Sequence, residues 1–191
     1  LSLAQYLDRD GCNEINDFFT EYNFEQKVEY AHSAEGTNYR IIAGDDEKEK
    51  SIFFRRKDVD VPIPFVEESM GNQNLLRLLP AFLYVLKKGG MLLIDEFSSG
   101  FHNQLESLMV RYFMQKSKNA QMIFVSHSTN LLSNSILRPD QEYTVEFHGN
   151  EGSSIHRISS DQPRSAQNVE KMYVSGVFGG IPLYHEVADE N

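Results

Sequence analysis

The feature that most constrains the fold is a pair of short apolar strands separated by a single helix. The first predicted strand covers residues 91–94, a helix follows over about 103–116, and the second strand covers 122–125. A strand, a crossover helix and another strand are typical of a parallel sheet. The sequence therefore predicts an α/β protein, with a parallel sheet and flanking helices.

A long apolar helix is predicted directly before the first of these strands. Residues 75–86 are apolar on nearly all sides, which a helix tolerates only when other elements bury it. Two lysines and two glycines, at 87–90, are typical of a helix C-terminus. Towards the end of the chain, strands are predicted at 142–148 and 154–158, joined by a hairpin-type turn, and a short helix is predicted after residue 168.

The first third of the chain has a different character. One or two short helices, broken at Gly11, precede β-rich stretches at 24–30, 39–43 and 51–56, which read as a small antiparallel meander or hairpin. The segment Asp58 to Phe65 contains Pro62 and Pro64, which cannot donate backbone hydrogen bonds to a neighbouring strand. We therefore expect this segment at a sheet edge or in an extended linker. We therefore divide the chain into a helical start with a β-rich insertion, residues 1–63, and an α/β part, residues 64–191.

Composition excludes several classes of protein. Asp and Glu number 28 against 18 Lys and Arg, a net charge of -10, which disfavours direct nucleic-acid binding by this chain. The apolar runs are far shorter than the roughly 20 residues of a membrane span. Cys12 is the single cysteine and can form no internal disulfide, so a cytoplasmic location is expected.

The chain begins at Leu1 with no signal region, and we expect it to be a piece of a longer protein.

A serine and a glycine stand just before the long apolar helix, in the run Glu68-Ser69-Met70-Gly71-Asn72. Unpaired N–H groups at a helix start, with a glycine that lets a ligand approach closely, can form an anion site. The alternative is that Ser69 is an ordinary helix cap.

Two carboxylates and a histidine follow the two predicted parallel strands. Asp95-Glu96 comes directly after residues 91–94; such a pair can hold a hard cation and accept a proton from an attacking water, or can simply be solvated. A turn, Ser98 to His102, comes next; by itself it could be no more than a strand-to-helix loop, with Asn103 as the helix cap. His127 follows the second strand and by itself would be read as a surface residue. Adjacent parallel strands end side by side, so the acids and His127 are predicted to meet at one sheet edge, where α/β proteins bind ligands.

In their order and spacing, these four motifs resemble the signature motif, Walker B strand, D-loop and H-loop of ATP-binding-cassette (ABC)-like ATPases. The variant is similar to the AAA-type ATPases related to the SMC, RecF and OLD proteins of genome maintenance and phage defence. The acidic residue before Ser69 and the histidine His102 match that subgroup. The resemblance covers about residues 64–184 and implies part of a P-loop NTPase domain.

The resemblance implies roles for individual residues. Asp95 would help to hold Mg²⁺, Glu96 would polarise the attacking water, and His127 would contact the γ-phosphate of ATP. Four further residues are implied in nucleotide binding: Ser69, Gly71, Asn72 and Ser99. Relatives hydrolyse ATP between two head-to-tail domains, so a homodimer is implied, with an effector protein as a further partner.

The sequence also departs from the family. It contains no GxxxxGK[ST] loop to grip the phosphates, and no glutamine can be assigned to the Q-loop. Asn72 stands where transporters carry Gln, and Asn103 stands where relatives often carry Pro. We therefore expect an ATPase in the full-length protein but an inactive fragment. The alternative is a non-catalytic interaction module derived from a truncated or degenerate ATPase.

A competing interpretation is a metal site at Glu35-Gly36 and Asp58-Val59-Asp60, which superficially resemble the acidic motifs of Toprim nucleases. Neither set follows a clean apolar strand, and Asp60 runs directly into the proline-containing segment. Solvated charged loops are therefore the favoured interpretation of both sets.

Overall fold

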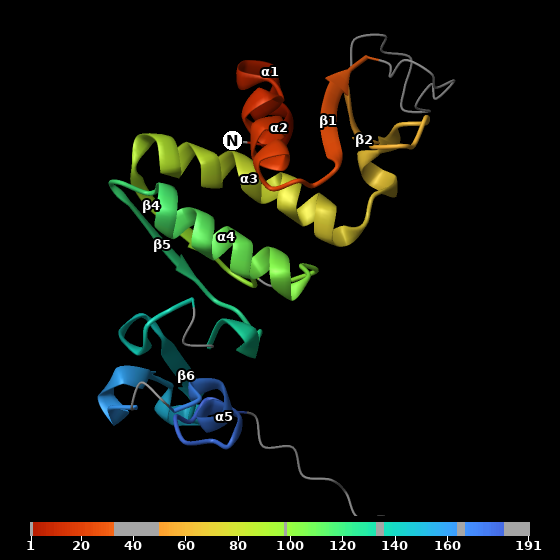
Figure 1. The fold of residues 1–191 in the computed structure, drawn as a ribbon. Coiled ribbons are helices and arrows are strands. Elements are labelled where there is room, and N and C mark those ends of the chain that lie inside the picture. Colours follow the sequence, from red (N-terminus) through yellow and green to blue (C-terminus); the bar gives the residue numbers. More distant parts are fainter. Residues whose placement is uncertain (1, 33–49, 98, 133–135, 164–166, 182–191) are drawn as a thin grey trace, which may run out of the picture. The chain divides into compact units, whose positions relative to one another are not determined.

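The structure is a computed structural model that describes residues 2–32, 50–97, 99–132, 136–163 and 167–181. It is a mixed α/β protein, and Figure 1 labels most of its helices and strands. The chain divides into two compact units: the first comprises Leu1–Glu106 and Tyr112–Ser126, and the second comprises Ser107–Arg111 and His127–Asn191.

The first unit opens with the two short helices predicted from the sequence. Helix α1 (Leu3–Asp10) ends at Gly11, whose φ of 71° lies in the left-handed region that favours glycine, and α2 (Asn13–Glu21) follows. Both helices contact α3 (Met70–Lys88). The predicted break at Gly11 is confirmed.

A three-stranded antiparallel sheet follows, with the strand order β1-β2-β3. It consists of β1 (Gln26–Ala31), β2 (Ser51–Arg56) and β3 (Ile63–Pro64). The proline-containing β3 pairs only with β2 in this order, so its predicted place at a sheet edge is confirmed. The strand predicted at 39–43 lies outside the described residues.

Helix α3 is the buried centre of the first unit. A short 3-10 turn, Phe65–Glu67, leads into it, and Gly89 ends it. Four of its apolar side chains have no exposed surface: Leu75, Leu76, Leu79 and Phe82. The apolar character of this helix on nearly all sides is thus explained by burial, as predicted.

The parallel sheet predicted from the sequence is present. Strand β4 (Gly90–Ile94), helix α4 (Asn103–Lys116) and strand β5 (Ala120–Phe124) form the crossover unit, with Leu93 opposite Ile123. One face of the sheet packs inward, where Leu92 is only 8% exposed. The other face carries four exposed apolar side chains: Met91, Leu93, Ile123 and Val125. Parallel sheets are normally covered on both faces, and the described residues leave this second face open.

The second unit is built around a hairpin. Strands β6 (Tyr143–Phe147) and β7 (Ser153–Arg157) pair antiparallel through the turn at Gly149–Glu151, as predicted. Helix α5 (Val169–Val174) and three further 3-10 turns, Thr129–Leu132, Pro139–Gln141 and Ile158–Asp161, complete the unit. Its core contains Ile158, Val169 and Phe178. None of the helices in the described part of the chain is long and apolar enough to cross a membrane.

Candidate functional site

Ser69 is the cap of α3. Its Oγ accepts the backbone N–H of Asn72 at 3.3 Å, which confirms the capping interpretation, and the side chain remains exposed. The first N–H groups of a helix have no partner within the helix and attract anions. Because Ser69 is both a cap and exposed, its predicted contact with a nucleotide remains compatible with this geometry.

Gly71 lies against the turn that follows the acidic pair. A Cβ atom on Gly71 would lie 2.4 Å from the carbonyl oxygen of Gly100, so only glycine fits without movement of the backbone. One turn further along α3, the Asn74 side chain donates from Nδ2 to the carbonyl oxygen of Ser99 at 3.0 Å. The structure thus brings two sequence-predicted motifs together: the signature segment (residues 68–72) and the D-loop turn (residues 99–102).

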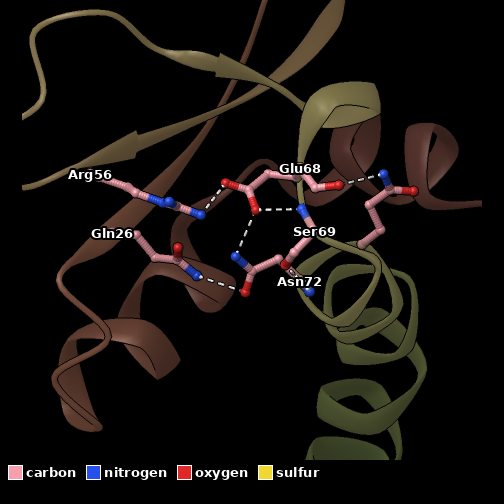
Figure 2. Close-up of polar contacts among 6 residues, drawn as sticks. Gln26, Arg56, Glu68, Ser69 and Asn72 are labelled. Carbon is pink, nitrogen blue, oxygen red and sulfur yellow. Dashed lines mark hydrogen bonds and ion pairs between the residues drawn. The ribbon is translucent and has the colours of Figure 1, made fainter. Parts of the chain in front are cut away.

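The side chain of Glu68 anchors the signature segment (Figure 2). Its carboxylate is almost fully buried, and Arg56 of β2 donates from Nη2 to Oε1 at 2.5 Å. Oε2 accepts the backbone N–H of Ser69 at 2.9 Å and Nδ2 of Asn72 at 2.8 Å. Both oxygens of this buried carboxylate are therefore paired, which is the arrangement that makes a buried charge tolerable.

The Asn72 amide is occupied within this network. Besides its bond to Glu68, its Oδ1 accepts Nε2 of Gln26 at 3.5 Å. Sequence reasoning missed Arg56 and Gln26 as supports of the segment, because they are 12 and 46 residues from their partners and lie on other elements. The only local signal was the acidic residue directly before the capping serine.

The acidic pair projects as a turn from the end of the parallel sheet. The N–H of Val125 donates to the carbonyl of Ile94 at 2.9 Å, and the N–H of Phe97 donates to the carbonyl of Val125 at 2.8 Å. Asp95 and Glu96 lie between these two bonds and are exposed. The strand ladder therefore fixes the turn on both sides.

Glu96 has a φ of 50°, in the left-handed region that is uncommon for residues other than glycine. Its N–H donates to Oδ1 of Asp95 at 3.0 Å, and its carbonyl accepts the N–H of Ser99 at 2.9 Å. These bonds hold the strained residue, and they connect it to the D-loop turn. Glu96 is thus presented to solvent on a short, well-supported loop.

His102 corrects one detail of the prediction. Asn103 was expected to cap the helix, but α4 begins at Asn103 and His102 is the cap, with Nδ1 accepting the N–H of Gln104 at 3.3 Å. An imidazole nitrogen is an acceptor like the side chains of the usual capping residues, so it can fill this position. Ser98 of the same turn lies outside the described residues.

His127 comes three residues after the end of β5 and is exposed, and its contacts group it with the second unit. The parallel pairing of β4 and β5 on which its placement depended is confirmed. The meeting of His127 with Asp95 and Glu96 stays a prediction.

Glu106 is a buried acid that sequence reasoning missed. It lies in the first turn of α4 and is 1% exposed, and its Oε1 accepts Oγ–H of Ser126 at 2.7 Å. Three other buried residues share its helix face at helical spacing: Met109, Val110 and Phe113. The position of this acid within an otherwise apolar stripe of the helix is the sequence signal that could have indicated its burial.

Residues 6–133 match a protein family described as "AAA domain, putative AbiEii toxin, Type IV TA system". The chain belongs to this AAA family. The matched region includes the signature segment, the acidic turn, the D-loop turn and His127, and it ends before the β6–β7 hairpin. The resemblance inferred from the motifs to AAA-type, ABC-like ATPases is thereby confirmed.

The fold is also similar to a chain solved in a study of the ATP-driven dimerization and DNA-stimulated activation of SMC ATPases. The TM-score is 0.49 at 12% sequence identity, and the similarity covers 81% of each chain. No curated protein matches the sequence.

An AAA domain implies nucleotide binding, and typically Mg²⁺. Within the described ranges, no group of three or more His, Cys, Asp or Glu side chains is arranged to hold a metal ion. Mg²⁺ at nucleotide sites is commonly bound through only one or two carboxylates together with phosphate oxygens and waters. The exposed carboxylate of Asp95 at the sheet edge suits that mode. Of the competing acidic site, Glu35 and Gly36 lie outside the described residues, and Asp58 and Asp60 are exposed after β2.

Proposed function

We propose that this AAA-family chain supplies part of an ATP-hydrolysing site. The observation that carries the proposal is the acidic turn: Asp95 and Glu96 are exposed at the end of a parallel strand and fixed there by the ladder bonds on either side. Ligands of open α/β sheets bind at this end of the strands. A rigid, exposed acid at such an edge is suited to act on a bound phosphate ester.

Each acid has a separate role in this proposal. Asp95 supplies a hard oxygen ligand for Mg²⁺, which neutralises phosphate charge when bound. Glu96 accepts a hydrogen bond from the attacking water and so orients it. His127 contacts the terminal phosphate as a donor.

The signature segment and the D-loop turn serve a partner protomer. Ser69 offers its hydroxyl at the start of α3, and Gly71 offers its place in the first turn of that helix, where the missing side chain lets the D-loop turn pack closely. Ser99 lies beside them, held by Asn74 of the same helix. Asn72 contributes by shaping the loop, since its amide bonds to Glu68 and Gln26. In a head-to-tail homodimer of the full-length protein, each chain would supply these groups to the nucleotide site of its partner.

The open face of the β4–β5 sheet supports the view that this chain is catalytically incomplete alone. Leu93 and Ile123 pair across this face and are 68% and 49% exposed. Burying such side chains is favourable by roughly 25 cal/mol for each Å², and the sequence has no GxxxxGK[ST] loop. We propose that a segment carrying such a loop covers this face.

Turnover of ATP by the complete protein tests the proposal through Glu96→Gln. The variant should bind ATP but lose at least about a hundredfold in turnover, the range expected for a general base. Glu25→Gln is the matched control, because Glu25 is also an exposed glutamate with left-handed backbone, φ 49°. Absence of turnover in the wild-type protein would instead favour an interaction module.

The cellular role that we propose is genome maintenance or phage defence, in the cytoplasm. It follows from the resemblance to the SMC, RecF and OLD group, and the toxin description of the matched family supports a role in defence. An effector protein would then be the element that ATP turnover controls. Purification of the complete protein with its bound partners tests this role.

A further inference from the structure

Glu106 is a buried carboxylate that the proposed mechanism does not use. Only one of its oxygens is paired: Oε1 accepts the Ser126 hydroxyl at 2.7 Å, whereas Oε2 is buried and has no partner among the described residues. A half-paired buried carboxylate is costly, and an apolar residue would fill this helix face more favourably. Packing therefore does not explain why an acid stands here.

The bond from Glu106 fixes the chain at the exit of β5. Val125 is already held by β4 through Ile94 and by the acidic turn through Phe97. The next residue, Ser126, is held by Glu106 from α4. The backbone is thus restrained from two sides immediately before His127.

The same glutamate is tied to the start of α4. Its N–H donates to the carbonyl of His102 at 3.2 Å, and the His102 ring caps the helix. Glu106 therefore connects the end of the D-loop turn to the residue that precedes His127.

We propose that Glu106 is a positioning residue that, through the Ser126 hydroxyl, sets the backbone from which His127 is presented to the nucleotide. The inference rests on the proposed ATP hydrolysis. Small displacements of a group that contacts the reacting phosphate are costly, and an error of about 1 Å can reduce the rate on the order of a hundredfold. The role is thus visible in turnover rather than in nucleotide affinity.

Steady-state ATP turnover of the complete protein tests the proposal with Ser126→Ala, which removes the donor, and Ser126→Thr, which keeps a hydroxyl. We expect Ser126→Ala to lower kcat about tenfold or more with KM for ATP within about twofold, and Ser126→Thr to restore most of kcat. Glu106→Leu should show the same loss, and combining it with Ser126→Ala should add little, because both remove one interaction.

Thr129→Val is the matched control. Its hydroxyl also donates to a glutamate, Glu170, at 2.8 Å, but this bond lies beyond His127 and within the second unit. We expect kcat of this variant to stay near the wild-type value.

Two results would overturn the inference while leaving the proposed function intact. The first is a kcat of Ser126→Ala equal to that of the wild type, when Glu96→Gln has shown that turnover depends on Glu96. The second is an equal loss of kcat in Ser126→Ala and Thr129→Val. If wild-type turnover is absent or does not depend on Glu96, the proposed function itself fails. The histidine ring signals in NMR spectra then decide the inference: the His127 signal must shift in Ser126→Ala but not in Thr129→Val.

Discussion

Two buried glutamates, one in each unit, show opposite ways of keeping a carboxylate out of water. Glu68 of the first unit has both oxygens paired, to Arg56 and to the start of α3. Glu142 of the second unit is 4% exposed, and neither of its oxygens has a hydrogen-bond partner in the described part of the chain. Burial alone raises the pKa of Glu142 to about 7. The first glutamate braces the signature segment, whereas the second has a pKa near neutral pH.

The largest expected effect is that of removing the brace. Glu68→Ala leaves the guanidinium of Arg56 and the amide of Asn72 without their shared acceptor, and should destabilise the first unit by about 3–4 kcal/mol. Urea unfolding measures the loss. The neighbouring Glu67 is exposed, so Glu67→Ala should cost less than about 0.5 kcal/mol. Equal effects of the two variants would show that Glu68 is not a brace.

Stability of the second unit should depend on pH through Glu142. Its pKa is raised from an ordinary value near 4.5 to about 7, so the folded state holds the proton more tightly than the unfolded state. Stability is then greatest at low pH within this window and falls as the pH rises from about 4.5 through 7, by up to about 3 kcal/mol. Thermal unfolding across this pH range measures the effect.

Glu142→Gln should remove this pH dependence and raise stability at pH 8, because no charge has to be buried. The exposed Glu151 provides the control, since Glu151→Gln should leave the pH profile unchanged. If the stability of the wild-type protein did not change between pH 4.5 and 7, Glu142 would not differ from Glu68 in the way described.

A smaller effect is expected at Gly71, where the braced loop meets the D-loop turn. Gly71→Ala places a methyl group 2.4 Å from the carbonyl oxygen of Gly100, and the resulting backbone shift should cost about 2 kcal/mol. Gly11→Ala is the comparison variant: no atom lies within 4 Å of the Cβ position there, and its cost comes from the positive φ of Gly11, which Gly71 does not share. Amide exchange at Ser99 and Gly100 should accelerate in Gly71→Ala only; unchanged exchange there would show that the contact is not restraining.

Much of the fold was predictable because its signals are local. The parallel strands β4 and β5 are short apolar runs around one helix, and α3 is a long segment that is apolar on nearly all sides, so run length and element order locate them. Likewise, Gly11 ends α1 as its backbone freedom predicts. These elements depend on neighbours along the chain, which a sequence displays directly.

The supporting contacts of the site were not predictable in the same way. Arg56 lies on a different element from Glu68, and Ser126 lies on a different element from Glu106, so no spacing rule links them. The cap at His102 was missed because asparagine, the stronger capping residue, stands next to it. Motif order located the candidate residues, whereas their bracing depends on tertiary contacts.

The proposed role of Glu96 in ATP hydrolysis is tested by measuring ATP turnover of the complete protein for the wild type and for Glu96→Gln side by side. We expect measurable hydrolysis by the wild type, a loss of at least about a hundredfold in the variant, and similar ATP binding by both proteins. Equal turnover of the two proteins would contradict this role.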